Sequence, residues 1–153
     1  MFNEKEQMSS ADNKELKLKL ASLYFYISKR LGIKETPKIK LTNSQKNADK
    51  KIKGLTGYYD HTTKTIKVYI TERHEIDVLR SFCHELIHHF QNERGILNSN
   101  KSSNNNQQHY AQNDLHLRKM EYQAFLLGSI LFRDWQDQQK YGHLKIEPPL
   151  PVI

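Results

Sequence analysis

Two histidines and a glutamate stand together near the middle of the chain, in the order His84, Glu85, x, x, His88. On a helix, residues four apart lie on the same face, so both imidazoles can bind one metal ion. Glu85 lies beside that pair, where a carboxylate can act as a general base without being a ligand. The spacing therefore predicts a zinc site that activates a zinc-bound water for hydrolysis.

The apolar residues around this motif indicate the helix that it needs. Six of them recur at helical spacing and leave His84 and His88 on a different strip. They are Ile76, Leu79, Cys83, Leu86, Ile87 and Phe90. We expect a helix from about residue 74 to 93, capped by Thr71 and ended by Gly95. The alternative is a pair of surface histidines on an amphipathic helix.

A third ligand must come from elsewhere, because a catalytic zinc site has three protein ligands and one open position. Glu121 lies on the apolar face of a helix predicted for residues 114–138. A carboxylate is disfavoured there unless it binds a metal or is satisfied by an arginine or a buried hydrogen bond. His109, His116 and Glu93 are the other candidate ligands. We expect Cys83 to be a small buried residue, and His89 to support a ligand or lie at the surface.

The rest of the chain predicts an α+β fold in a single domain, residues 13–140. A helix over residues 13–31 ends at Gly32, and a short strand is expected at 38–42. The segment 43–53 is predicted to be a loop. The runs 54–59 and 64–70 then predict a β-hairpin in a small, mostly antiparallel sheet. The predicted order is N-terminal helix, sheet, His-Glu helix and C-terminal glutamate helix.

Three segments have little to bury. Residues 1–12 are predicted to be a disordered N-terminus, and residues 98–113 a polar mobile loop rich in Asn, Ser and Gln. Residues 141–153 are read as a proline-rich, extended tail.

The chain has 153 residues, a net charge of +7 and one cysteine. The positive charge allows nucleic-acid contact through a basic surface, but no nucleic-acid-binding motif accompanies it, so a solvated basic face is favoured. No signal peptide or membrane span is recognisable, and one cysteine allows no internal disulfide. We therefore expect a cytoplasmic protein that does not contact a membrane.

The motif His84-Glu85-x-x-His88, followed by Glu121 on a later helix, resembles the gluzincin type of zinc metallopeptidase. This resemblance implies a zincin-like single domain that binds one zinc ion per chain through His84, His88 and Glu121. Glu85 would then activate the zinc-bound water for hydrolysis of a peptide bond. A protein or peptide substrate would lie extended along the sheet edge near residues 64–70.

Two narrower resemblances bear on the same helices. Glu121-x-x-Ala124-Phe125 is similar to the glutamate helix of the ImmA/IrrE metallopeptidases. Residues 84–89 together with 132–135 are similar to metallopeptidase-like proteins of tailed phages, which would place the protein in the cytoplasm of a host cell. Spacing does not assign a residue that stabilises the transition state.

Two other functions remain open on the sequence. The chain can be a basic nucleic-acid-associated protein with a structural zinc site, or a catalytically inactive interaction module with a zincin fold. Candidates for a transition-state stabiliser, if the chain is an enzyme, are Tyr110, Tyr122 and His116. Glu85 favours the enzyme, because a structural zinc site has no use for a general base.

Overall fold

The computed structural model describes residues 10–50, 55–98 and 114–142. Residues 143–153 of the predicted tail, most of the 98–113 loop, His109 and Tyr110 lie outside these residues, as do residues 1–9. Tyr141, predicted to begin the extended tail, is instead the last residue of a helix. The chain forms, in order, α1 (Ser10–Leu31), β1 (Lys38–Thr42), α2 (Gln45–Asp49), β2 (Gly57–Asp60), β3 (Thr65–Tyr69), α3 (Glu75–Glu93) and α5 (Leu115–Tyr141). The predicted α+β class is therefore confirmed.

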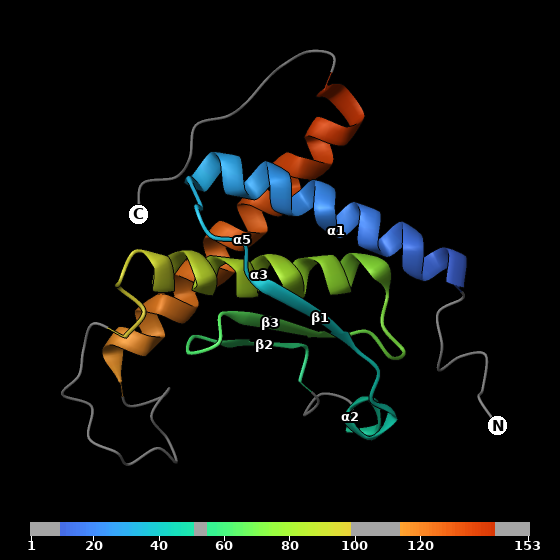
Figure 1. The fold of residues 1–153 in the computed structure, drawn as a ribbon, viewed down its shortest axis with the longest axis horizontal. Coiled ribbons are helices and arrows are strands. Elements are labelled where there is room, and N and C mark those ends of the chain that lie inside the picture. Colours follow the sequence, from blue (N-terminus) through green and yellow to red (C-terminus); the bar gives the residue numbers. More distant parts are fainter. Residues whose placement is uncertain (1–9, 51–54, 99–113, 143–153) are drawn as a thin grey trace.

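Helix α3 lies at the centre of the fold, between the sheet and α1, and α5 crosses it (Figure 1). Strands β2 and β3 pack against α3, and α1 and α5 contact α3 and each other. The consequence for α3 is burial of most of its second half, from Phe82 to Gln91, with only His84 of that stretch partly exposed. A motif in this stretch is held rigidly by packing from both sides.

The periodicity of the first helix has the expected effect. Five of its apolar residues recur every three or four positions and are buried: Leu16, Leu20, Leu23, Ile27 and Leu31. Gly32 follows with a φ of +72°, a conformation that glycine adopts without strain, and its N–H bonds to the Ser28 carbonyl at 2.8 Å. The helix begins at Ser10, three residues before the predicted start.

The sheet is mixed rather than mostly antiparallel, so that part of the prediction is wrong. Strand order is β1-β3-β2. β2 and β3 form the predicted antiparallel hairpin, but β1 pairs with β3 in parallel, with Lys38 opposite Thr65 and Thr42 opposite Tyr69. The alternation within β1 predicts a strand but says nothing about the direction of its neighbour.

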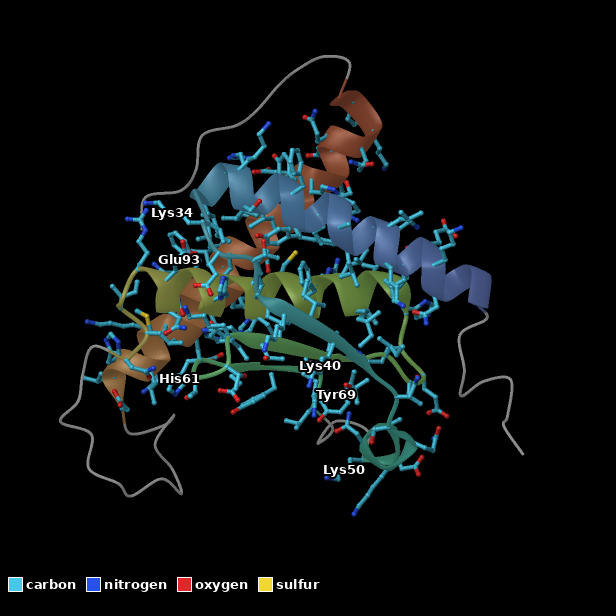
Figure 2. The ribbon with its side chains drawn as sticks, viewed as in Figure 1. Lys34, Lys40, Lys50, His61, Tyr69 and Glu93 are labelled. Atoms are coloured by element: carbon cyan, nitrogen blue, oxygen red, sulfur yellow. The ribbon has the colours of Figure 1, made fainter. Side chains whose placement is uncertain are left out.

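The position of β3 also changes which strand is available at an edge. Residues 64–70 were expected to offer a sheet edge, but β3 is the central strand and both of its sides are paired. Within the described part of the chain, β2 has one unpaired side. Ile66 and Val68 of β3 are fully buried toward the helices. Lys40 and Tyr69 lie on the opposite side of the sheet from α3 (Figure 2).

Two local predictions are also wrong. The segment expected to be a loop contains the short helix α2, whose N-cap Ser44 accepts a hydrogen bond from the Asn47 N–H at 3.1 Å. Thr71 does not cap α3, because His74 occupies the N-cap position. The Thr71 hydroxyl instead accepts from the Ser44 N–H at 2.8 Å and so joins the end of β3 to the start of α2.

Candidate metal centre

Helix α3 presents His84 and His88 side by side, as their spacing predicts. Their ring centroids are 4.9 Å apart and their planes are inclined at 80°. The side chain of His88 is 9% exposed and that of His84 is 26% exposed. Both imidazoles therefore reach one point at the edge of the buried part of the helix.

Helix α5 comes unusually close to this part of α3. A Cβ atom placed on Gly128 would lie 3.3 Å from the backbone nitrogen of His84, and Ala124 is fully buried. Glu121 lies three residues before Ala124 and seven before Gly128, so the three share one strip of the helix. The two small residues let the backbones approach, and the approach brings the carboxylate of Glu121 to the two imidazoles.

The Glu121 carboxylate lies between the two rings. Its Oε2 is 3.0 Å from His84 Nε2 and its Oε1 is 2.9 Å from His88 Nε2. The structure thus brings the three predicted ligands together. The burial argument for Glu121 was wrong, however, since its side chain is 57% exposed and Phe125 on the same strip is 68% exposed. Glu121 borders the buried face of α5 instead of lying within it.

The geometry of this group fits a zinc ion. One ligand atom from each of the three residues lies within 4.8 Å of the other two. Tetrahedral zinc bonds of about 2.0–2.2 Å place neighbouring ligand atoms roughly 3.3–3.6 Å apart, so small side-chain adjustments suffice. Two imidazoles and one carboxylate form a three-ligand set found in catalytic zinc sites. These residues can hold a metal ion, and the exposure of Glu121 leaves one side of the group open.

The charges of the group favour a positive charge beside Glu121. Hydrogen bonds from His84 and His88 hold the pKa of Glu121 far below its usual value. Burial disfavours a charged His88, but the carboxylate of Glu121, with Gln91 and Glu85, outweighs burial and raises the pKa of His88. The carboxylate therefore needs positive charge beside it, which protons on the rings or a bound metal can provide.

Glu85 lies next to the group but faces another element. Glu85 is 8% exposed, and burial raises the pKa of its carboxyl, although His88 and His84 counteract part of that effect. A Cβ atom on Gly57 of β2 would lie 3.1 Å from Glu85 Cγ and 3.3 Å from its Oε1. The edge strand therefore runs directly over Glu85, with glycine at the point of contact.

These residues open into a cleft of about 1000 Å³ between β2, α3 and α5. One wall contains Gly57 and Tyr58, and the other contains Leu117 and Phe125 on either side of Glu121. The full lining also includes, among others, Leu55, His61, Arg80, Ser81, His84, Glu85, His88, Leu97 and Ser129. The cleft thus joins the candidate metal ligands to the unpaired edge of β2.

Gln91 is a residue of this region that the sequence prediction missed. It is fully buried, and its Oε1 lies 2.8 Å from His88 Nδ1. Its Nε2 donates to the Met120 carbonyl at 3.0 Å and to Gln123 Oε1 at 2.7 Å, both on α5. A signal was present, because Gln91 is three residues after His88 and seven after His84, on the same helical strip.

His89 belongs to a second polar cluster, on another side of α3. It is 1% exposed, so it does not lie at the surface. Its Nδ1 is 2.9 Å from the Tyr59 hydroxyl and its Nε2 is 2.6 Å from the Glu35 carbonyl. Asn92 donates to the same Tyr59 hydroxyl at 3.0 Å. His89 therefore links α3 to β2 and to the segment before β1, away from the candidate ligands.

The other candidate ligands are engaged elsewhere or lie outside the described residues. Glu93, the last residue of α3, accepts a hydrogen bond from the Lys34 N–H at 2.7 Å (Figure 2). His116 Nε2 lies 2.6 Å from the Ile96 carbonyl. Tyr122, a candidate transition-state stabiliser, is 71% exposed on α5 and is not part of the cleft lining.

Cys83 is fully buried and its thiol pKa is raised by burial, which confirms its prediction as a small core residue. None of the helices within the described ranges combines the length and apolar character needed to cross a bilayer. Comparison of the whole chain with protein-family models, curated proteins and solved structures gave no match. The geometry of the site is therefore the evidence on which a function can be argued.

Proposed function

We propose that this chain is a zinc-dependent peptidase of the gluzincin type. One observation carries the proposal: ligand atoms of His84, His88 and Glu121 lie within 4.8 Å of one another, beside a buried Glu85. The group opens into a cleft bordered by a strand with an unpaired edge. Metal, general base and a place for an extended substrate are the three parts that hydrolysis of a peptide bond requires.

Glu85 would carry the proton during the reaction. A zinc ion held by the three ligands supplies Lewis acidity, which acidifies water and polarises a carbonyl group. As the water oxygen attacks the carbonyl carbon, Glu85 accepts the proton that the water loses. When the C–N bond breaks, Glu85 passes that proton to the amine nitrogen. Burial raises the pKa of Glu85, so its carboxylate binds a proton more readily than an exposed glutamate does.

Strand β2 is the proposed site for an extended protein or peptide substrate. Gly57, Tyr58 and Tyr59 line the cleft, and the side of β2 that does not face β3 has no strand partner in the described residues. An extended peptide can add to such an edge through backbone hydrogen bonds. This replaces the expectation that residues 64–70 provide the edge.

A structural zinc site is the second candidate, and the ligand count weighs against it. Structural zinc sites are closed by four protein ligands, whereas the group found in the described part of the chain has three members. Glu121 is also 57% exposed, which leaves the group accessible. A nucleic-acid-associated protein would bind nucleic acid through its lysines with an affinity that falls steeply with salt, and replacement of Glu85 would not change that affinity.

Replacement of Glu85 tests the proposal. Purified wild-type protein and Glu85→Gln are compared for zinc content by mass spectrometry and for cleavage of casein. We expect Glu85→Gln to retain zinc and to lose about 10²- to 10⁴-fold in cleavage rate, since general-base catalysis contributes that much. Glu93→Gln is a matched control, because Glu93 lies on the same helix but bonds to the Lys34 backbone.

Two results would contradict the proposal. If Glu85→Gln cleaved casein as fast as the wild type, the activity would not come from this site. If the wild type held zinc but cleaved neither casein nor a peptide library, an inactive interaction module would be the better explanation.

A further inference from the structure

Gln91 bonds to a candidate ligand and to the helix that carries another. It is fully buried between α3 and α5, where an amide without partners would be strongly disfavoured. Both of its N–H donors and its oxygen are used, by Met120, Gln123 and His88. An amide satisfied on all sides has one fixed orientation.

The orientation of this amide follows from its neighbour on α5. The Met120 carbonyl can only accept a hydrogen bond, so the NH₂ group of Gln91 must face it at 3.0 Å. The Gln91 oxygen then faces His88 Nδ1 at 2.8 Å, and this nitrogen must carry a proton to donate. In a neutral imidazole the other nitrogen, Nε2, keeps its lone pair.

Nε2 of His88 is the atom that faces the candidate metal site. It lies 2.9 Å from Glu121 Oε1. Gln91 therefore selects the tautomer in which the lone pair of His88 points to the position where a metal would bind. Bonds of this kind to the remote nitrogen of a histidine ligand fix its ring and typically change metal affinity 10- to 100-fold.

The NH₂ group of the Gln91 amide bonds to the other helix, α5. The Met120 carbonyl belongs to the peptide unit that joins Met120 to Glu121. Its hydrogen bond to Gln91 therefore holds the α5 backbone next to the carboxylate ligand, at the point where Gln91 also holds His88. One side chain connects the two helices that supply the ligands.

We propose that Gln91 is a positioning residue of the metal site, which orients His88 and fixes the position of Glu121 relative to it. This inference rests on the proposed function in one respect, because it assumes that the group binds zinc. The inference adds Gln91, which would not touch the metal but would set the zinc affinity of His88 and Glu121, which would.

The test compares zinc affinity in four proteins: wild type, Gln91→Leu, Gln91→Glu and Asn92→Ala. Affinity is measured by competition with a chromophoric chelator, and ring ¹⁵N shifts of His88 are recorded for the zinc-loaded forms. Gln91→Leu removes the hydrogen bond to His88 and the hydrogen bonds to α5. Gln91→Glu keeps an oxygen for His88 Nδ1–H but loses the donor to the Met120 carbonyl. Asn92→Ala removes a neighbouring amide that bonds to Tyr59 and the His61 carbonyl instead.

We expect Gln91→Leu to bind zinc about 10- to 100-fold more weakly than the wild type and to lose the protected Nδ1–H signal of His88. Gln91→Glu should keep that signal and bind zinc more tightly than Gln91→Leu. Asn92→Ala should lower the stability of the metal-free protein to urea but leave zinc affinity within twofold of the wild type.

The proposal is overturned if Gln91→Leu binds zinc within twofold of the wild type, or if Asn92→Ala weakens zinc as much as Gln91→Leu does. Either result would mean that Gln91 stabilises the fold without positioning the metal ligands. A wild-type protein that binds no zinc would instead refute the proposed function itself. If Gln91→Leu fails to fold, Gln91→Glu decides: loss of its Nδ1–H signal contradicts the orienting role.

Discussion

His88 and His89 are adjacent in the sequence and both are buried, yet the clusters around them are built in opposite ways. Around His89 every polar contact is internal: one ring nitrogen meets the Tyr59 hydroxyl and the other meets the Glu35 carbonyl. Around His88, Nδ1 meets the buried Gln91, but Nε2 meets the carboxylate of Glu121, whose side chain is 57% exposed. His88, His84 and Glu121 together line a cleft.

The difference follows from helix geometry. Consecutive residues are about 100° apart around a helix, so one of the two histidines faces α5 and the other faces the sheet and the segment before β1. A buried polar cluster that serves the fold closes on itself, because unpaired groups cost free energy. A cluster suited to chemistry leaves several ligand atoms converging on a point that solvent can reach. The structure contains one of each on successive residues.

The largest effect is expected when the open cluster is broken. His88→Ala removes one of three ligands, so zinc affinity should fall by more than about 100-fold, beyond the loss typical of residues that only support a ligand. The stability of the metal-free protein should change less than in the corresponding change at His89. Chelator competition and urea unfolding measure the two quantities. A variant that still bound zinc tightly would remove His88 from the site.

Breaking the closed cluster should have the reverse outcome. His89→Leu leaves the Glu35 carbonyl without the ring donor and the Tyr59 hydroxyl without its acceptor, which should lower the free energy of unfolding by roughly 1–3 kcal/mol. Zinc affinity should stay within a few-fold of the wild type. Urea unfolding of the metal-free protein gives the first value. If zinc affinity fell as far as in His88→Ala, the two clusters would not be separate.

The pH dependence of zinc binding should separate the clusters further. Burial disfavours the charged form of His88, but Glu121 outweighs burial, so the pKa of His88 is raised above its usual value. Below that raised pKa, zinc must displace a proton, and affinity should fall by about tenfold per pH unit for each proton displaced. Titrations between pH 5 and 8 test this. In Glu121→Gln the loss of affinity should begin at a lower pH.

The raised pKa of His88 has the opposite consequence for the stability of the metal-free protein, which should fall as the pH rises. A raised folded-state pKa means that His88 contributes stability that is fully present below its unfolded pKa and is lost as pH rises through the folded value. Zinc and protons therefore stabilise the same cluster and compete for it. Urea unfolding with a chelator present should show this loss in the wild type and not in His88→Ala.

A smaller effect is expected where the edge strand meets the general base. Gly57→Ala places a methyl group 3.1 Å from Glu85 Cγ and 3.3 Å from the Lys67 carbonyl. Glu85 must shift, so cleavage should slow several-fold while zinc content stays the same, with a stability loss of about 1–3 kcal/mol from overpacking. Ser129→Ala, at the rim of the same cleft, is the control. Unchanged cleavage by Gly57→Ala would mean that β2 does not constrain Glu85.

Much of the fold could be predicted because the signals are local. The leucines of α1, the glycines that end α1 and α3, and the alternation in β1 and β3 each report on a few neighbouring residues. The pairing of β1 with β3 joins residues 27 positions apart, from Lys38 opposite Thr65 onward, and no local pattern encodes its direction. For that reason the parallel pair, and with it the central position of β3, were missed.

The site shows the same division. His84 and His88 are predicted by their spacing on one helix, whereas the prediction of Glu121 rests on a burial that the structure does not show. It reaches the histidines because Gly128 lets α5 approach α3, a contact between helices. Gln91 had a local signal in its spacing from both histidines, but its bonds to α5 are tertiary. The contact of Gly57 with Glu85 has no counterpart in the sequence.

Whether these residues form a metal centre is tested most directly by the zinc content of the purified protein, measured by mass spectrometry for the wild type and for Glu121→Ala. Glu121 joins the two histidines at 2.9 and 3.0 Å, and it is exposed enough that its loss should not unfold the chain. We expect one zinc ion per chain in the wild type and a large loss in the variant. No zinc in the wild type, or the same zinc content in both proteins, would contradict the claim that these residues form a metal centre.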